Sequence, residues 1–516
     1  MTLATRRRPD AAIDHLLGSG PTASSDAART TTENKKHWTR ADGRGPVSET
    51  PPGDRRTIRN RSRHEFRNNS YYRGAVRAIV GDTIGTGPRL QMLTPDAKLN
   101  ADVQDLWRAW SASADWALTC RVLVGVGEVA GECFGVLRQS KRLERLGLPV
   151  SVDLKLIEPD QVAHPGGYGL YPSQYGDDGI ETDEDGEVLR YSILKTHPGD
   201  PIFARLTQQA TVVDADYVLH WFEPERPGQL RGNIPWESSL TIFNELRRFS
   251  KAVVTAAEIA AMLAGVMKNP HLPVDSEAYL GRQADQESWF DTVELVRGML
   301  VTLPPGMDVE QFKPEQPTTN YDMFVTAKLK EIGRCRNMPY GKIAGDHSRY
   351  NYSSSRMDDA PYWSDRETQR QGLEAKVFDP FLYRWLAFAK MAIPALQKYD
   401  GAFWKLKHKW QYPARPTSDP TADATADELN LTNGADTLTA IAERDGLTRD
   451  ELLDARKADQ DAYITRGLAL PPWLAGASAP TRNEKGRPTA QQPAKPGADA
   501  RTILMPVHRQ EVVYAA

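Results

Sequence analysis

The sequence predicts an α+β fold that is mainly helical. Long segments carry apolar residues three and four positions apart, which favours helices. Four short segments rich in β-branched residues are separated by Gly, Pro and Asp clusters, which favours strands. All four lie between residues 132 and 222, so we expect one mostly antiparallel module within a helical protein. At 516 residues the chain is also too long for a single compact core.

The first predicted helical stretch runs from residue 58 to residue 85 and is strongly basic. Between residues 55 and 77 the only acid is Glu65. Such a charge pattern is typical of a solvated or interface helix pair, and it also allows direct contact with nucleic acid. The arginines concerned are Arg55, Arg56, Arg59, Arg61, Arg63, Arg67, Arg73 and Arg77.

Two apolar helices are expected next, at 95–116 and 119–129, and the strand-rich segments follow them. Gly125, Gly127 and Gly131 have the spacing GxGxxxG with no strand before them, so they do not predict a dinucleotide site. The four expected strands are 132–137, 152–157, 188–194 and 211–222.

A long helix is predicted from residue 237 to residue 268, about 45 Å in length. Its alanines between 256 and 264 permit close helix packing, so it could be a buried core helix or a helix packed against copies of itself. An insert of roughly fifty residues follows. Within it we expect a polar helix at 285–297 and a hairpin that joins 299–303 to 309–312 through Pro304-Pro305-Gly306.

A short basic helix at 321–337, a polar loop at 338–355 and a helical stretch at 356–397 are expected after the insert. Pro361, Pro380 and Pro394 should kink or interrupt the last of these. The closing region is predicted to form short acidic helices, one of them at 447–463, with Thr448 as N-cap and Glu451 completing a capping box.

Charge is unevenly distributed along the chain. The formal net charge is -3, yet residues 417–465 hold twelve Asp or Glu against four Lys or Arg, a net of -8 that leaves +5 elsewhere. A nearly neutral total argues against a tight, sequence-independent DNA binder, which needs many phosphate contacts. It is compatible with a protein through which DNA passes.

Composition also bears on location. No apolar run is long enough to span a bilayer, and no secretory signal is recognised behind Arg6, Arg7 and Arg8. Three scattered cysteines favour a reducing compartment, so we expect cytoplasmic synthesis and no membrane association. Residues 1–36 and 471–516 are expected to be disordered.

Catalytic motifs are missing from the sequence. Gly341-Lys342 does not complete a Walker A motif, and there is no HExxH or GxSxG. Asp346-His347 is interpreted as a turn rather than a metal-ligand pair. Glu128 and Glu132 are interpreted as parts of a helix-to-strand junction rather than an acid/base pair. We therefore expect no enzyme activity, no cofactor and no metal.

Several local strings occur in one order from about residue 37 to residue 410, and together they resemble the lambda-type phage portal proteins. They include Gly81-Asp-Thr-Ile-Gly-Thr-Gly-Pro, Ile157-Glu-Pro-Asp, His197-Pro-Gly-Asp, Asn351-Tyr-Ser-Ser and the run from Arg226 to Trp236. The acidic region resembles the family less well, because its expected Asp-Pro entry is matched only by Asp419-Pro420.

The resemblance implies the phage portal fold, with wing, stem, clip and crown regions. It places an N-terminal arm at 1–36, the wing at 37–235 and 356–415, the stem helices at 236–268 and 319–338, the clip at 269–318, the tunnel loop at 339–355, the crown at 416–470 and a tail at 471–516. The implied assembly is a ring, twelve-fold in virions, at one capsid vertex. Through it double-stranded DNA is packaged and ejected without sequence specificity.

Partners follow from the same resemblance. They are other copies of the chain, the large terminase subunit that supplies the ATPase, head-tail adaptor proteins and the major capsid protein. The protein would be made in the bacterial cytoplasm and end in the virion. A capsid adaptor or scaffolding protein without a channel, and a DNA-processing enzyme of a packaging operon, stay open as alternatives.

Two sets of site residues are predicted under this resemblance. Basic residues of the second stem helix and three residues of the tunnel loop should face DNA in the channel. Pairing with acids such as Glu245 or Glu331 is an alternative for the helix residues, and ordinary loop packing is an alternative for Arg349 and Tyr350. Arginines of the first helical stretch should contact a neighbouring subunit or the capsid protein, with DNA as the competing partner. The channel set is Lys328, Lys330, Arg334, Arg336, His347, Arg349 and Tyr350, and the interface set is Arg59, Arg63, Arg67, Arg73 and Arg77.

Overall fold

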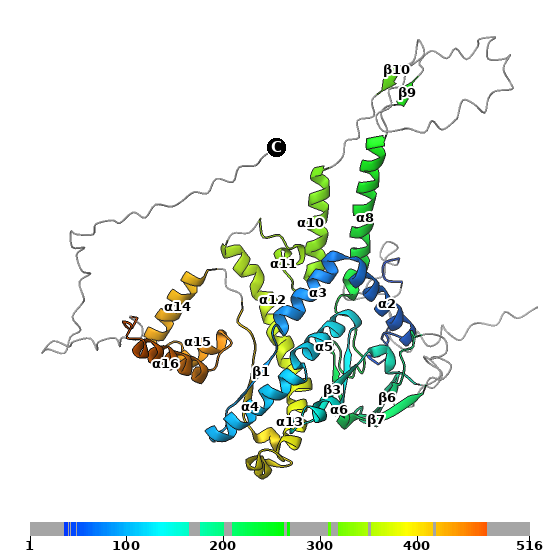
Figure 1. The fold of residues 1–516 in the computed structure, drawn as a ribbon. Coiled ribbons are helices and arrows are strands. Elements are labelled where there is room, and N and C mark those ends of the chain that lie inside the picture. The colour runs from blue at the N-terminus through cyan, green and yellow to red at the C-terminus, as the bar shows by residue number, and fades with distance from the viewer. Residues whose placement is uncertain are drawn as a thin grey trace, which may run out of the picture. The chain divides into compact units, whose positions relative to one another are not determined.

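A computed structural model gives the arrangement of the chain (Figure 1). Contacts divide the chain into two compact units, the first comprising 1–435 and 444–446 and the second 436–443 and 447–516. Helices predominate, as predicted, and every strand pair among the described residues is antiparallel. The structure describes residues 36–39, 41, 43–47, 49–164, 176–200, 209–262, 266–268, 308–310, 318–348, 352–415 and 419–471.

The basic N-terminal stretch forms two helices, α2 (Pro52–Asn68) and α3 (Ser70–Thr83). They are separated by Asn69, whose extended backbone ends α2 and whose side chain starts α3. The Asn69 amide oxygen accepts the backbone N–H groups of Tyr71 and Tyr72 at 3.1 and 3.3 Å, which satisfies two donors of the first turn. The predicted helix pair is therefore confirmed.

The main apolar core lies between α4 (Ala97–Ser113), α5 (Trp116–Ala130) and α13 (Asp379–Ala389). Aromatic rings from the three helices meet there, among them Trp107, Trp110, Trp116, Phe381 and Trp385. Beside this core, β1 (Arg89–Met92) pairs with β11 (His408–Gln411) and so joins positions more than 300 residues apart.

Two small sheets form the strand-rich module. One has the order β3-β2-β8, from β2 (Cys133–Gln139), β3 (Val152–Ile157) and β8 (Val218–Trp221). The other has the order β4-β5-β6-β7, from β4 (Gly176–Asp177), β5 (Ile180–Thr182), β6 (Val188–Leu194) and β7 (Ala210–Asp214). A short helix, α6 (Lys141–Arg145), connects β2 to β3.

The prediction of one strand at 211–222 is wrong. A 3-10 turn, η3 (Ala215–Tyr217), interrupts this segment, and the strands on its two sides belong to different sheets. The turn moves the chain from the edge of one sheet to the edge of the other, which a run of β-branched residues alone does not reveal.

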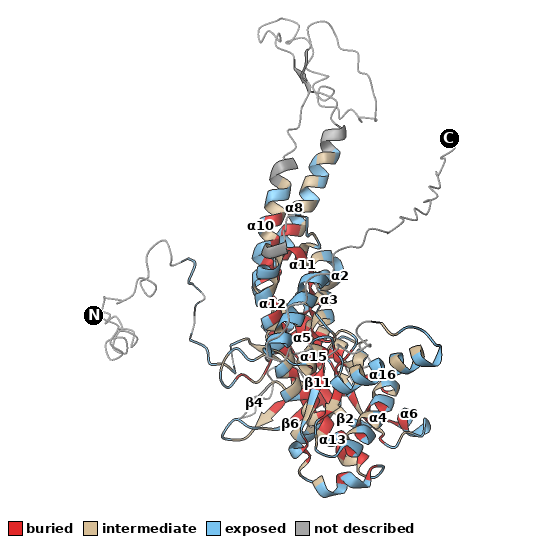
Figure 2. Ribbon diagram, turned by 90° about the vertical axis from the view of Figure 1, so that its left-hand side faces the viewer, coloured by how far each residue is buried: buried red, intermediate tan, exposed pale blue. Residues whose placement is uncertain are grey.

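The predicted long helix is α8 (Glu237–Met262), which is six residues shorter than expected because Val266–Lys268 forms strand β9 instead. It runs beside α10 (Thr318–Arg334), and the ring of Phe249 packs on Tyr321 and Phe324 between them (Figure 1). Figure 2 shows that the buried positions of this helix pair lie at its base, where it joins the rest of the unit.

Strand β9 pairs with β10 (Asp308–Glu310), so the run after Pro304-Pro305-Gly306 pairs with the end of the α8 segment. The other arm of the predicted hairpin, 299–303, lies outside the described residues, as does the predicted helix at 285–297. The two ends expected to be disordered lie outside them as well, except residue 36 and residue 471.

The segment expected to be a loop at 338–355 contains a short helix, α11 (Tyr340–Ala344), and already enters α12 (Tyr352–Leu373). Pro361 lies inside α12 without ending it. A π-helical turn, η5 (Glu374–Phe378), separates α12 from α13, with Pro380 in the first turn of α13. Pro394 begins a 3-10 turn, η6 (Pro394–Tyr399), and a second one, η7 (Phe403–Lys405), precedes β11.

Three helices form the acidic region: α14 (Pro420–Asn433), α15 (Leu438–Arg444) and α16 (Arg449–Thr465). The capping box predicted at the start of the last one is present. The N–H of Glu451 donates to the hydroxyl oxygen of Thr448 at 2.9 Å, and the N–H of Thr448 donates to the Glu451 carboxylate at 2.9 Å.

No helix in the described part of the chain is both long and apolar enough to cross a bilayer. The three cysteines, Cys120, Cys133 and Cys335, are free thiols.

Replacing Trp110 by alanine should remove a large side chain from the middle of the aromatic core. Its ring is 1% exposed, and its indole N–H donates to the carbonyl of Val152 at 3.0 Å. We expect a loss of about 3–5 kcal/mol in the free energy of unfolding, measured by urea titration followed by circular dichroism. The control is Trp38→Ala, because Trp38 is 56% exposed; equal shifts for the two variants would contradict this account of the core.

Candidate functional site

The basic residues predicted on the second long helix fall into three different environments. Lys330 and Arg334 lie one turn apart on the exposed side of α10. Lys330 places its ammonium 5.9 Å from the ring centroid of Tyr340, and Arg334 donates to the side-chain oxygen of Asn337 at 3.1 Å. Among the described residues no carboxylate pairs with either cation, so both charges are available to an external partner.

Lys328 is half-buried and already paired. Its ammonium donates to Glu331 at 3.0 Å and lies 3.7 Å from Glu245 on α8. The hydrogen bond to Glu331 raises the pKa of Lys328 above its ordinary value. The alternative of pairing with Glu245 and Glu331 therefore holds for this residue, within one subunit.

Arg336 is buried, which contradicts its predicted role as a DNA-facing residue. Its guanidinium donates to Glu128 at 2.5 Å and to Glu223 at 2.8 Å. Burial alone would lower the pKa of Arg336, but the two carboxylates outweigh burial and raise it. Glu128 also accepts the indole N–H of Trp236 at 2.9 Å and the amide of Gln369 at 3.0 Å. These contacts tie the end of α10 to α5 and α12.

The chain leaves α10 in a defined direction. Asn337 has a left-handed backbone, φ 48°, and the N–H of Met338 donates to the carbonyl of Gly333 at 2.9 Å. This closure satisfies a carbonyl at the helix end and turns the chain toward α11.

The remaining residues predicted to face the channel are on the segment after α11. His347 is exposed, and the N–H of Ser348 donates to the Asp346 carboxylate at 2.9 Å, which confirms the predicted turn. Arg349 and Tyr350 lie outside the described residues.

The arginines predicted to form an interface also differ in their exposure and pairing. Arg67, Arg73 and Arg77 are exposed, and no acid among the described residues pairs with them. Arg63 is partly buried and binds Asp160 and Glu158 at 2.6 and 3.0 Å. Arg59 is 1% exposed, so it cannot contact a neighbouring subunit, and its predicted interface role is wrong.

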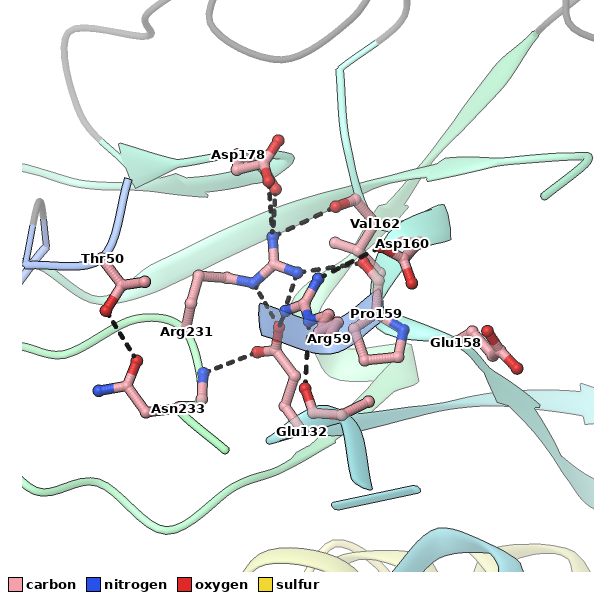
Figure 3. A network of polar contacts seen from close by, with 12 residues as sticks. Thr50, Arg59, Glu132, Glu158, Pro159, Asp160, Val162, Asp178, Arg231 and Asn233 are labelled. Carbon is pink, nitrogen blue, oxygen red and sulfur yellow. Dashed lines mark hydrogen bonds and ion pairs between the residues drawn. The ribbon is translucent and has the colours of Figure 1, made fainter. Parts of the chain in front are cut away.

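Arg59 belongs to a buried ion-pair centre around Glu132 (Figure 3). The Glu132 carboxylate accepts hydrogen bonds from Arg59, from Arg231 at 2.8 Å and from the backbone N–H of Gly232 at 2.9 Å. It also lies 2.9 Å from Nε2 of His220. Figure 3 shows the guanidinium groups of Arg59 and Arg231 converging on one carboxylate. Arg231 also donates to the carbonyls of Asp178, Pro159 and Val162.

Electrostatics within this centre favours the charged carboxylates. Burial would raise the pKa of Glu132, but Arg231 and Arg59 hold it well below its usual range. Burial likewise opposes ionisation of Asp160, and Arg59 and Arg63 still lower its pKa. Burial is the largest influence on His220 and lowers its pKa, so the imidazole is neutral at pH 7.

One group in the described part of the chain has the composition of a metal site: Glu158, Asp160 and His197. The N–H of Gly199 donates to Nδ1 of His197 at 2.9 Å. A neutral imidazole with Nδ1 as acceptor carries its proton on Nε2, and Nε2 lies 3.2 Å from Glu158. That nitrogen has no lone pair for a metal, and Arg63 already bridges both carboxylates. The group is an ion-pair cluster rather than a metal centre.

Sequence reasoning missed both buried centres. It identified Glu128 and Glu132 as members of a helix-to-strand junction, and the structure confirms that position, between the end of α5 and β2. Their signal was two acids in an otherwise apolar stretch, which already indicates a need for buried cations. The partners Arg231 and Arg336 are about 100 and 200 residues away, so no local pattern points to them.

Replacing Glu132 by glutamine should leave Arg59 and Arg231 buried with too little negative charge. Breaking such a pair by removing one partner costs about 3–5 kcal/mol, and we expect that loss in urea unfolding. The matched control is Glu158→Gln, whose side chain is 50% exposed; its loss should stay below about 1 kcal/mol. A neutral effect of Glu132→Gln would contradict the importance of this centre.

Stability should depend on the charge state of His220. The unfolded chain takes up a proton below about pH 6.5, whereas the buried imidazole resists it. Stability should therefore fall as the pH drops from 7.5 to 5.5, by at most about 1.4 kcal/mol per pH unit from this residue. The difference between wild type and His220→Gln, measured across that range, isolates the effect because other groups titrate in both; a pH-independent difference would contradict it.

Comparisons with known proteins agree on one family. The profile described as phage portal protein, lambda family, matches residues 31–370. The chain is 23% identical over 460 residues to a probable portal protein of Halomonas phage phiHAP-1 (isolate -/Gulf of Mexico/-/2001), covering 84% of this chain and 86% of that protein.

Two solved structures are similar at low identity. The neck of an empty GTA particle, computed with C6 symmetry, is 15% identical with a TM-score of 0.44, covering 86% of this chain and 100% of that chain. An HK97 family phage portal protein from Corynebacterium diphtheriae is 12% identical with a TM-score of 0.29, covering 65% and 91%. Because the family profile matches the larger part of the sequence, the chain belongs to the lambda family of phage portal proteins.

Proposed function

We propose that copies of this chain form a ring at one vertex of a capsid and that double-stranded DNA passes through its centre during packaging and ejection. The observation that carries the proposal is the pairing of α8 with α10 in a member of the portal family, with Lys330 and Arg334 exposed on α10 and without a carboxylate partner in the part of the chain that the structure describes. The buried positions of both helices lie at their base (Figure 2), so the part of the pair beyond the base is free to meet neighbouring copies.

The dimensions of such a ring suit a duplex. Helix axes pack at about 8–10 Å, so twelve copies side by side place one helix each on a circle of roughly 35 Å in diameter, with a bore of about 25 Å. At 1.5 Å per residue, the 26 residues of α8 would give such a wall a height of about 39 Å.

Moderate charge is what a sliding channel needs. Phosphate contacts are sequence-independent, and strong ones repeated around a ring would hold the DNA in place. In each chain Lys328 is neutralised by Glu331 and Glu245, and Arg336 forms ion pairs with Glu128 and Glu223. Lys330 and Arg334 would form the rings of positive charge along the bore, with His347, Arg349 and Tyr350 touching the backbone from the tunnel loop.

The other regions have structural roles in this proposal. Residues 37–235 and 356–415 form the wing, 269–318 the clip that docks the terminase and later the head-tail adaptor proteins, and 416–470 the crown. Arg67, Arg73 and Arg77 on the exposed side of α2 and α3 contact a neighbouring subunit or the capsid protein. The role is structural in the virion, and the ATPase of packaging belongs to the terminase.

Negative-stain images of the purified full-length protein test the assembly. A portal shows rings with an open centre, whereas a capsid adaptor without a channel does not. Rings closed along the axis, or a chain that stays monomeric under every assembly condition, would overturn the proposal.

Neutralising the exposed cations of α10 tests the channel. The double variant Lys330→Ala/Arg334→Ala should still form rings, because neither side chain pairs with an acid within the described part of the subunit. DNA packaging or retention should fall by about tenfold in an in vitro packaging assay, since twelve copies each lose two phosphate contacts. The control is Lys141→Ala/Lys155→Ala, which removes two exposed charges outside the stem; equal effects would contradict the assignment of α10 to the bore.

A further inference from the structure

Lys342 lies where three helices meet: α3, α11 and α12 (Figure 1). It follows Gly341 in the sequence without completing a Walker A motif, so nucleotide binding does not account for it. The Lys342 ammonium donates to a carboxylate oxygen of Asp82 on α3 at 2.9 Å. The same oxygen accepts the hydroxyl of Tyr362 on α12 at 2.8 Å. One carboxylate therefore holds a group from each of the other two helices.

Two aromatic rings of α12 face the same ammonium. Nζ of Lys342 lies 4.9 Å from the ring centroid of Tyr362 and 5.2 Å from that of Trp363, distances at which a ring attracts a cation. The side chains of Lys342 and Asp82 are each 19% exposed, so water screens the ion pair only in part. We call Lys342, Asp82, Tyr362 and Trp363 the α11 clamp.

The partner of Lys342 is itself held in place by other contacts. Arg370 of α12 donates to the carbonyl of Asp82 at 2.7 Å and to that of Thr83 at 3.0 Å, which satisfies two acceptors at the end of α3. The hydroxyl of Thr83 donates to Gln369 of α12 at 2.9 Å. Because α3 and α12 are joined without Lys342, the lysine attaches α11 to a pair of helices that is already formed.

Helix α11 needs such an attachment. It has five residues, whereas an isolated helix shorter than about 12–15 residues is marginal in water. No side chain caps its N-terminus, and Gly345 ends it with a left-handed backbone, φ 68°. Ile343 supplies a buried apolar contact, and Lys342 supplies the ion pair. The position of α11 therefore depends on these tertiary contacts.

His347, predicted to face the channel, lies three residues beyond the end of α11. Burial raises the pKa of Asp359 on α12, while Lys342 and His347 both oppose this shift. Both cations are thus within electrostatic reach of one carboxylate on α12. The place of His347 follows from that of α11, because so few residues separate them.

We propose that Lys342 is a positioning residue that holds α11, and with it His347, in place beside DNA moving through the channel. It acts through Asp82 and the two rings of the clamp. Its ammonium is engaged within the subunit, so Lys342 is not itself a phosphate contact. The inference rests on the proposed channel and names the interaction that keeps this segment from being displaced as DNA slides past.

Hydrogen–deuterium exchange of the full-length protein tests the clamp without DNA. The N–H groups of residues 342 and 343 donate to the carbonyl of Pro339 at 3.1 and 3.2 Å. In Lys342→Met these amides should exchange about tenfold faster, whereas Lys342→Arg, which keeps a cation, should retain most of the protection. The matched control, Lys390→Met, removes an ion pair of 2.6 Å with Asp400 and should leave α11 unchanged. Wild-type exchange in Lys342→Met would overturn the inference.

DNA retention in packaged particles tests the positioning role. Lys342→Met should form rings at the wild-type protein concentration, because the clamp lies within one chain. Retention should fall several-fold, less than in Lys330→Ala/Arg334→Ala, and Lys342→Arg should restore it. Asp82→Asn should cause a similar loss, and Asp82→Asn/Lys342→Met should be no worse than the more severe single variant, because both residues act through one contact.

The remaining outcomes separate this inference from the proposed function. Full DNA retention in Lys342→Met despite faster exchange of α11 would overturn the positioning role and leave the channel proposal intact. Additive losses in the double variant would also overturn it, because the two residues would then act independently. A wild-type chain that never forms rings would overturn both proposals.

Discussion

Burial of the Glu132 carboxylate is the constraint on which the rest of the first unit depends. A carboxylate away from water is tolerated only when cations and N–H donors surround it. Here Arg59 comes from α2, Arg231 and Gly232 from the segment after β8, and His220 from β8 itself. Because every donor must reach one carboxylate, the N-terminal helices and the strand-rich module have a single mutual arrangement.

Glu128, one helical turn earlier in α5, does the same for the base of the α8–α10 pair. It binds Arg336 at the end of α10 and Gln369 on α12, and Trp236 immediately before α8 donates to it as well. Two acids of one helix-to-strand junction thus position both the module and the base of the long helix pair. Through Arg336 the rotation of α10 about its axis is set, and with it the side on which Lys330 and Arg334 are exposed.

Internal pairing also determines how much positive charge the surface keeps. Arg59, Arg63 and Arg336 neutralise buried or partly buried carboxylates. Exposed cations remain in small groups, among them those on α2, α3, α10 and the segment after α13. This distribution suits the channel function that we propose, because few unpaired cations per copy would permit weak contact with DNA, while separate groups could serve contacts between copies.

The sequence by itself determined the local structure. Apolar periodicity predicted α2 to α5, α8 and α10, and β-rich segments predicted β2, β3 and β6. Thr448 and Glu451 predicted their capping box because caps depend only on neighbours within one turn. Tertiary structure alone decided which cations face outward. Arg334 and Arg336 are two positions apart in one basic run, yet one is exposed and the other is buried, since the acids that bind Arg336 come from α5 and from the segment after β8. Tertiary structure also decided that residues 211–222 are divided between two sheets, because strand pairing depends on contacts across the fold and not on local composition.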